Sequence, residues 1–122
     1  MSTARKVIAV IDDDEIMLEA LERLLSSFGY QTELYESAEA FIVAATKSEA
    51  ACLIVDIMLG DITGVELGRQ LSAMGFTFPV IFMTGSDDAL VRKQAMELGC
   101  IAYLRKPFPA NELEVAITEA IG

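Results

Sequence analysis

Histidine is absent from the 122-residue sequence, which removes the commonest general base and any phosphohistidine formed on this chain. The Gly-x-x-x-x-Gly-Lys pattern that binds nucleotide phosphates is also missing. No apolar run approaches the about 18 residues that a membrane-spanning helix needs. Because 53% of the residues are nevertheless hydrophobic, we expect a sheet covered on both faces and no contact with a membrane.

Basic residues are scarce. Nine lysines and arginines stand against 19 acidic residues, giving a formal net charge of −10. Without a basic face to neutralise phosphates, we expect no binding of nucleic acid, and a divalent cation or a basic protein patch is the expected partner. The segment Met1 to Lys6 has neither the apolar region nor the cleavage site of a signal peptide, so we expect a cytoplasmic protein.

Cysteine occurs only at positions 52 and 100. Both residues lie in apolar, strand-like runs, which predicts reduced cysteines in the core. If one strand separates theirs, the two residues lie about 9 to 10 Å apart, beyond the about 7 Å that a disulfide tolerates.

The stretch from Cys52 to Asp56 organises the rest of the chain. Its four apolar residues are too few for a buried helix and include β-branched side chains, so they predict a central strand covered on both faces. In open parallel sheets, ligands bind outside the carboxyl ends of the strands. We therefore expect Asp56 to face solvent at that edge, and it is the candidate functional centre.

Strand-like and helix-like patterns alternate along the whole sequence. This alternation predicts one α/β domain over residues 1–122, doubly wound, with a parallel sheet between two layers of helices. The expected strands cover residues 7–11, 31–35, 52–56, 79–83 and 100–104. The expected helices cover residues 14–28, 37–45, 63–74, 91–98 and 109–121.

Residues that follow the strands collect at one edge of such a sheet. Clustered carboxylates repel one another, so they need a cation or shifted pKa values, and their hard oxygens suit Mg²⁺. A cation, a hydroxyl and an ammonium around one carboxylate are the groups that phosphoryl transfer onto it requires. The residues at this edge are Asp12, Asp13, Asp14, Asp56, Thr84, Gly85, Ser86, Arg105, Lys106 and Pro107.

Each of these residues also has a purely structural explanation. Asp13 or Asp14 would cap the first helix, Thr84 would bond locally, and Lys106 would be a solvated charge. The convergence of four strand ends favours a shared site. Three further acids are expected to serve only loops or helix starts: Asp61, Asp87 and Asp88.

Four motifs follow one another along the sequence: Val10-Ile11-Asp12-Asp13-Asp14, Asp56-Ile57-Met58-Leu59 with Gly64, Val80-Ile81-Phe82-Met83-Thr84-Gly85, and Tyr103-Leu104-Arg105-Lys106-Pro107-Phe108. On these motifs the sequence resembles the receiver domains of two-component response regulators over nearly its whole length. The resemblance implies a flavodoxin-like (βα)5 three-layer sandwich with strand order 2-1-3-4-5.

The resemblance implies that Asp56 accepts a phosphoryl group from a phosphohistidine on a sensor histidine kinase or a histidine phosphotransfer protein. Asp12, Asp13, Asp56 and the backbone carbonyl of Met58 would bind Mg²⁺, with Mn²⁺ as a substitute. A chain of this kind is a self-phosphorylating acceptor with slow autodephosphorylation, and not a turnover enzyme.

It also implies a switch. Lys106 and Thr84 would contact phosphoryl oxygens, and movement of Thr84 would let the Tyr103 ring enter from the surface. This movement would reshape the face formed by the fourth helix, fifth strand and fifth helix, which would act on a partner or output domain. The Lys106-Pro107 bond is a candidate cis bond, and three residues would tune the reaction: Met58, Gly85 and Ser86.

The sequence departs from the family pattern in three places, one of which is Gly85, where a common alanine is replaced and more room is left near Thr84. Gly60 replaces a common proline, which predicts a looser loop after Asp56. The run Cys100 to Ala102 replaces the acidic pair used in dimers of winged-helix transcription factors, and residues 111–121 contain no arginine. We therefore expect a monomer or a weak, phosphorylation-dependent dimer, with an apolar surface for a partner.

Two other functions remain open at this point. A haloacid-dehalogenase-type phosphohydrolase would use Asp12 as the nucleophile, with Asp14 two residues on and Asp87-Asp88 as a later acidic pair. Its motif order fits less well, and 122 residues leave no room for a cap. The second alternative is a receiver-like interaction module that works without phosphorylation.

Overall fold

The computed structural model describes residues 5–86 and 88–122. Residues 1–4, part of the segment that bears on the signal-peptide prediction, and Asp87 lie outside the described residues. The strands are β1 (Val7–Ile11), β2 (Gln31–Tyr35), β3 (Ala50–Asp56), β4 (Val80–Thr84) and β5 (Ala102–Arg105). The helices are α1 (Glu15–Ser27), α2 (Ala38–Ala44), the short 3-10 helix η1 (Ala45–Lys47), α3 (Gly64–Ala73), α4 (Ala89–Glu97) and α5 (Ala110–Ile121).

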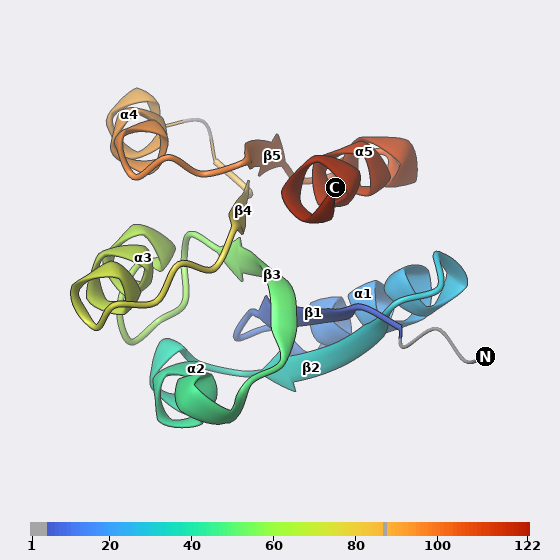
Figure 1. Cartoon of the computed structure of the whole chain (residues 1–122). Coiled ribbons are helices and arrows are strands. Elements are labelled where there is room, and N and C mark those ends of the chain that lie inside the picture. The colour runs from blue at the N-terminus through green and yellow to red at the C-terminus, as the bar shows by residue number, and fades with distance from the viewer. Residues whose placement is uncertain (1–4, 87) are drawn as a thin grey trace.

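All five strands are parallel and lie in the order β2-β1-β3-β4-β5. Helices α1 and α5 cover one face of the sheet, and α2, α3 and α4 cover the other (Figure 1). The three-layer, flavodoxin-like fold predicted from the sequence is confirmed.

Two hydrophobic clusters hold the layers together, one on each face of the sheet. Along β1, Ala9 and Ile11 belong to the cluster under α2 and α3, whereas Ile8 and Val10 belong to the one under α1 and α5. A central strand therefore buries consecutive residues on both sides, which explains the high hydrophobic content. Among the described residues, no helix is long and apolar enough to cross a membrane.

Strand boundaries differ from the prediction by one or two residues. β3 begins earlier, at Ala50, because that residue pairs with Val7 of β1. β4 begins at Val80, after Pro79, which has no N–H to donate to a ladder. β5 begins at Ala102, so Cys100 lies outside the strand and is half-buried, contrary to the prediction. Both cysteines are free, as expected.

Side-chain caps set the start of four helices. Asp14, and not Asp13, caps α1 by accepting a hydrogen bond from the Ile16 N–H at 3.0 Å. Thr63 accepts from the Glu66 N–H at 3.0 Å and so starts α3, as its spacing predicts. Ser37 and Asp88 cap α2 and α4 in the same way.

Candidate functional site

The buried polar side chains of the described residues lie at the carboxyl edge of the sheet. They number three: Asp12, which is 0% exposed, Asp56 at 7% and Thr84 at 1%. Each follows or ends a central strand, so the strands fix the position of the backbone. Asp56 is more enclosed than the sequence predicts, because Lys106 packs against it.

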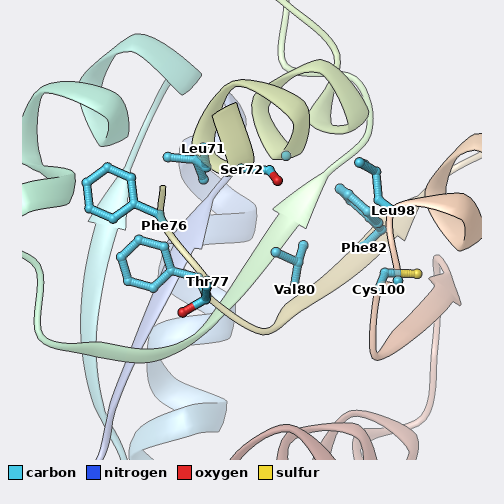
Figure 2. A pocket seen from close by; sticks show the side chains of 11 residues that line it. Leu71, Ser72, Phe76, Thr77, Val80, Phe82, Leu98 and Cys100 are labelled. Atoms are coloured by element: carbon cyan, nitrogen blue, oxygen red, sulfur yellow. The ribbon is translucent and has the colours of Figure 1, made fainter. Parts of the chain in front are cut away.

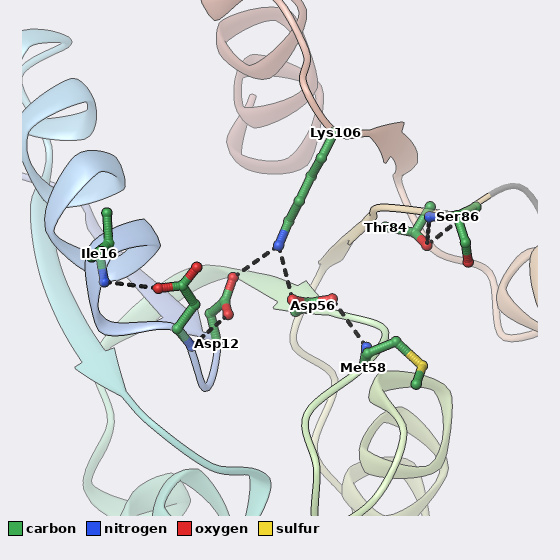
Figure 3. A network of polar contacts seen from close by, with 8 residues as sticks. Asp12, Ile16, Asp56, Met58, Thr84, Ser86 and Lys106 are labelled. Atoms are coloured by element: carbon green, nitrogen blue, oxygen red, sulfur yellow. Dashed lines mark hydrogen bonds and ion pairs between the residues drawn. The ribbon is translucent and has the colours of Figure 1, made fainter.

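Lys106 joins the two buried carboxylates. Its Nζ donates to Asp56 Oδ2 at 2.8 Å and to Asp12 Oδ2 at 3.1 Å (Figure 3). Burial acts to lower the pKa of Lys106, but the hydrogen bond to Asp56 and the negative charges of both aspartates outweigh it and raise that pKa. The lysine is therefore held as a charged ammonium between β1, β3 and the segment after β5.

The carboxylates outnumber the ammonium. Oxygens of Asp12, Asp13 and Asp56 all lie within 4.8 Å of one another. Burial raises the pKa of Asp12 above its usual range, although the Asp14 N–H and the Lys106 ammonium act in the opposite direction. Three acids facing one ammonium form a site that is short of positive charge, and all the ligand atoms are hard oxygens, which fits Mg²⁺.

The loop after β3 completes this edge. The Met58 N–H donates to Asp56 Oδ1 at 3.0 Å, so both oxygens of the acid are held in place. Gly60 has φ +91°, and a Cβ there would lie 3.3 Å from Asp13 Oδ2. The glycine lets this loop pass close to the acidic group. Ligation by the Met58 carbonyl stays a prediction.

Thr84 bonds within its own loop. Its Oγ1 donates to the Ser86 carbonyl at 3.0 Å and accepts from the Ser86 N–H at 3.2 Å (Figure 3). A side chain at Gly85 would meet no atom within 4 Å. The hydroxyl thus lies at the same edge of the sheet as Asp56, and the space beside its loop is open.

Tyr103 is half-buried, and its hydroxyl is enclosed without a hydrogen-bond partner among the described residues. The sequence interpretation placed this ring at the surface, but the ring packs against the core cluster under α2 and α3. The Arg92 guanidinium lies over the ring, 5.8 Å from its centroid. Sequence reasoning missed Arg92, because a contact between α4 and β5 leaves no local pattern.

Three other acids singled out in the sequence accept hydrogen bonds from backbone N–H groups. Asp14 caps α1, Asp61 accepts from the Glu39 N–H at 3.2 Å, and Asp88 caps α4. These contacts agree with the loop and helix-start roles predicted for Asp61 and Asp88. Asp14, which a hydrolase of the haloacid-dehalogenase type would use together with Asp12, accepts the capping hydrogen bond of α1. The Lys106–Pro107 peptide bond is cis.

Comparison with known proteins gives a consistent set of similarities. The family model described as response regulator receiver domain matches residues 8–118. The response regulator protein TodT of Pseudomonas putida is 36% identical over 121 residues, which are 99% of this chain and 53% of TodT. The transcriptional regulatory protein FixJ of Bradyrhizobium diazoefficiens is 35% identical over 119 residues, 98% of this chain and 58% of FixJ.

Solved structures agree with this comparison. The crystal structure of FixJ-N has a TM-score of 0.89 and 29% identity, covering 98% of this chain and 95% of its own. A response regulator receiver protein from Burkholderia phymatum has a TM-score of 0.84 and 34% identity, and the match covers 97% of this chain and 96% of that protein's chain. The chain spans about half the length of the curated relatives it matches.

Proposed function

The chain belongs to the response regulator receiver domain family, and from that premise we propose that Asp56 accepts a phosphoryl group from a phosphohistidine on a partner protein. The observation that carries the proposal is the position of Lys106, whose ammonium bonds to Asp56 and Asp12 beside a group of three carboxylates. The donor would be a sensor histidine kinase or a histidine phosphotransfer protein, and the reaction would take place in the cytoplasm.

The proposed reaction is an in-line displacement at phosphorus. An oxygen of Asp56 forms the new O–P bond, while the P–N bond to the donor imidazole breaks and its electron pair stays on that nitrogen. Asp12, Asp13, Asp56 and the Met58 carbonyl would hold Mg²⁺, or Mn²⁺ in its place. When bound, the cation neutralises charge on the phosphoryl oxygens.

Lys106 has a second role in this proposal. Its ammonium lies 2.8 Å from Asp56 Oδ2, so it can donate a hydrogen bond to an oxygen of the phosphoryl group that arrives on Asp56. Charge in a loose transition state spreads over the equatorial oxygens, so a fixed ammonium stabilises it. The chain acts as an acceptor, and loss of the phosphoryl group to water would be tuned by the exposed Met58 and by Gly85 and Ser86.

The proposed switch involves the hydroxyls of Thr84 and Tyr103. A phosphoryl group brings about −2 charge and strong acceptors, which would draw the Thr84 hydroxyl away from the Ser86 carbonyl. The Tyr103 hydroxyl is buried and has no partner among the described residues, a situation that costs about 1–3 kcal/mol, so this ring gains by moving to a position where the hydroxyl is bonded. The face formed by α4, β5 and α5 would change with it.

Two surfaces suit the proposed partners. A hollow of about 370 Å³ between α1 and the segment after β5 adjoins Lys106 and is lined by apolar side chains, including Leu21, Leu24 and Phe108. Because it opens beside the acceptor site, we propose it as the docking surface of the phosphohistidine donor. Exposed Leu90, Ile101 and Val115 would contact the downstream target, whether a separate protein or an output domain.

The proposal is tested by incubating the chain with Mg²⁺ and either acetyl phosphate or a phosphorylated histidine phosphotransfer protein, then mapping the modified residue by mass spectrometry. We expect one phosphoryl group on Asp56, held as an acyl phosphate that hydroxylamine cleaves, and none after Asp56→Asn. Asp14→Asn is the matched control, because asparagine caps a helix equally well and the variant should be phosphorylated normally.

The other outcomes separate the alternatives. Phosphorylation of Asp12, or loss of phosphoryl uptake in Asp14→Asn, would favour the haloacid-dehalogenase-type hydrolase. A folded chain that takes up no phosphoryl group from either donor would favour the interaction module that works without phosphorylation.

A further inference from the structure

A second hollow lies toward the opposite end of the sheet from Asp56. It is bounded by the carboxyl half of α3, the segment that leads into β4, and the turn from α4 to β5 (Figure 2). Its volume is about 270 Å³, and none of its lining side chains is charged. Val80, in its wall, precedes Thr84 by four residues along β4, about 13 Å, so this hollow is separate from the acceptor site.

We propose that this hollow binds an uncharged molecule with one aromatic ring and one polar substituent. The inference does not depend on phosphorylation of Asp56. It follows from the walls, the volume and the polar groups at the mouth of the hollow.

The walls are largely fixed by aromatic packing. The rings of Phe76 and Phe78 are stacked, with centroids 5.4 Å apart and an interplanar angle of 20°. Phe78 in turn makes an edge contact with the buried Phe41, at 5.5 Å and 68°. Because these rings hold one another, the hollow exists before a ligand arrives, and a flat ring can pack against them.

Gly68 lets α3 pack closely against the inner end of the hollow. A Cβ at Gly68 would lie 3.1 Å from Leu98 Cδ1 and 3.7 Å from Phe82 Cζ. Any larger residue at position 68 would therefore crowd Leu98 and contact Phe82, which line the hollow together with Leu71. The side chains at this inner end are apolar, and an apolar cavity of about 150 Å³ already accepts benzene.

The side chains at the mouth of the hollow favour an uncharged ligand with a polar substituent. Ser72 and Thr77 line the hollow and are exposed, so their hydroxyls can bond one polar substituent while the ring lies inside. A carboxylate or ammonium would lose its hydration with no side chain of opposite charge to replace it. The net charge of −10 further disfavours an anion.

The experiment is a titration of the ¹⁵N-labelled chain with p-cresol, and in parallel with p-toluate, which has the same ring but carries a charge. We expect saturable shifts in the amide signals of Leu71, Phe78 and Cys100 with p-cresol, and no saturable shift with p-toluate. Ser72→Phe fills the mouth and should weaken p-cresol binding about tenfold or more. Ala73→Phe, exposed on the same helix but outside the lining, should bind as the unchanged protein does.

Several results would overturn the proposal. These are the absence of saturation by p-cresol, equal binding of p-toluate, and undiminished binding by a folded Ser72→Phe variant. If the saturable amide shifts are confined to residues of the hollow between α1 and the segment after β5, the ligand binds there and not in the proposed site. Shifts at Leu71 and Cys100 that depend on protein concentration alone would mean that a second copy of the chain occupies the hollow. If Ser72→Phe does not fold, the p-cresol and p-toluate comparison decides.

Discussion

Lys106 illustrates how much one side chain contributes at this site. Its ammonium contacts Asp12, which has no exposed surface, and Asp56, which has little. We expect Lys106→Met to lower the free energy of unfolding by about 1–3 kcal/mol in the absence of Mg²⁺, because two enclosed carboxylates lose their cation. Urea denaturation measures the change. Lys93→Met, on the exposed side of α4, should change stability by less than about 0.5 kcal/mol, and an equal effect of the two variants would contradict this account.

Two tyrosines allow a comparison of how a bonded and an unbonded hydroxyl affect stability. Within the part of the chain that the structure describes, the buried Tyr103 hydroxyl has no partner, whereas the Tyr35 hydroxyl donates to Glu33 Oε1 at 2.9 Å. We expect Tyr103→Phe to leave stability unchanged or raise it by up to about 1 kcal/mol, and Tyr35→Phe to lower it by about 1 kcal/mol. Thermal and urea unfolding of the two variants give the answer, and a loss in Tyr103→Phe as large as in Tyr35→Phe would show that the Tyr103 hydroxyl is bonded in solution.

The direction in which a side chain points is what the sequence does not predict at this scale. Strand ends predict that Thr84 and Asp56 lie at one edge, but not that Thr84 bonds to Ser86. They leave open whether Asp13 or Asp14 caps α1, because both are acids at the same helix start. The position of Arg92 over Tyr103 depends on how α4 packs on β5, which no local pattern specifies.

At the scale of elements, the approach of α3 to β3 depends on Gly64. A Cβ at this first residue of α3 would lie 2.5 Å from the Asp56 carbonyl oxygen and 3.0 Å from Val55 Cγ1. We expect Gly64→Ala to lower the free energy of unfolding by about 1–3 kcal/mol, because the helix start must move away from the strand that carries Asp56.

Gly85→Ala is the control for this prediction. Its φ is not positive, and a Cβ there would meet no atom within 4 Å, so we expect a change within about 0.5 kcal/mol. Equilibrium urea denaturation of both variants tests the pair. If the two substitutions have the same effect, contact between α3 and β3 does not require glycine at Gly64.

The existence of every strand and α-helix could be predicted from the sequence, whereas several of their ends could not. Apolar runs identify strands because both faces of the sheet are covered. A strand ends where its neighbour stops pairing, so Ala50 joins β3 through Val7, although alanine is a poor strand former. The 3-10 helix at Ala45–Lys47 has no such signal, since it only continues α2.

At the scale of the whole molecule, topology explains why the grouping of these side chains could be predicted. Once the strands are parallel, their carboxyl ends meet at one edge, and this brings Asp12, Asp56, Thr84 and Lys106 together from segments up to 94 residues apart. The hollow near Phe76 was not predicted, because its shape results from aromatic packing between α2 and the segment that joins α3 to β4, and from the absence of a side chain at Gly68.

The net charge of −10 makes the response to cations a property of the whole molecule. Any salt should stabilise the fold somewhat by screening this charge, but only a bound ion should stabilise it beyond that. We expect MgCl₂ to raise the free energy of unfolding more than KCl of equal ionic strength. This extra stabilisation by MgCl₂ should grow with the logarithm of the Mg²⁺ concentration. It should reach about 2.7 kcal/mol when that concentration is one hundred times the dissociation constant of Mg²⁺.

Two variants separate binding from screening. Asp13 is exposed and lies in the acidic group, so Asp13→Asn should fold normally and lose most of the excess stabilisation by Mg²⁺. Asp14→Asn removes the same charge one residue away but keeps the α1 cap, so it should retain that excess. Urea denaturation in the two salts compares them directly. If both variants lose the excess equally, Mg²⁺ acts through the overall charge of the chain and not through the group formed by Asp12, Asp13 and Asp56.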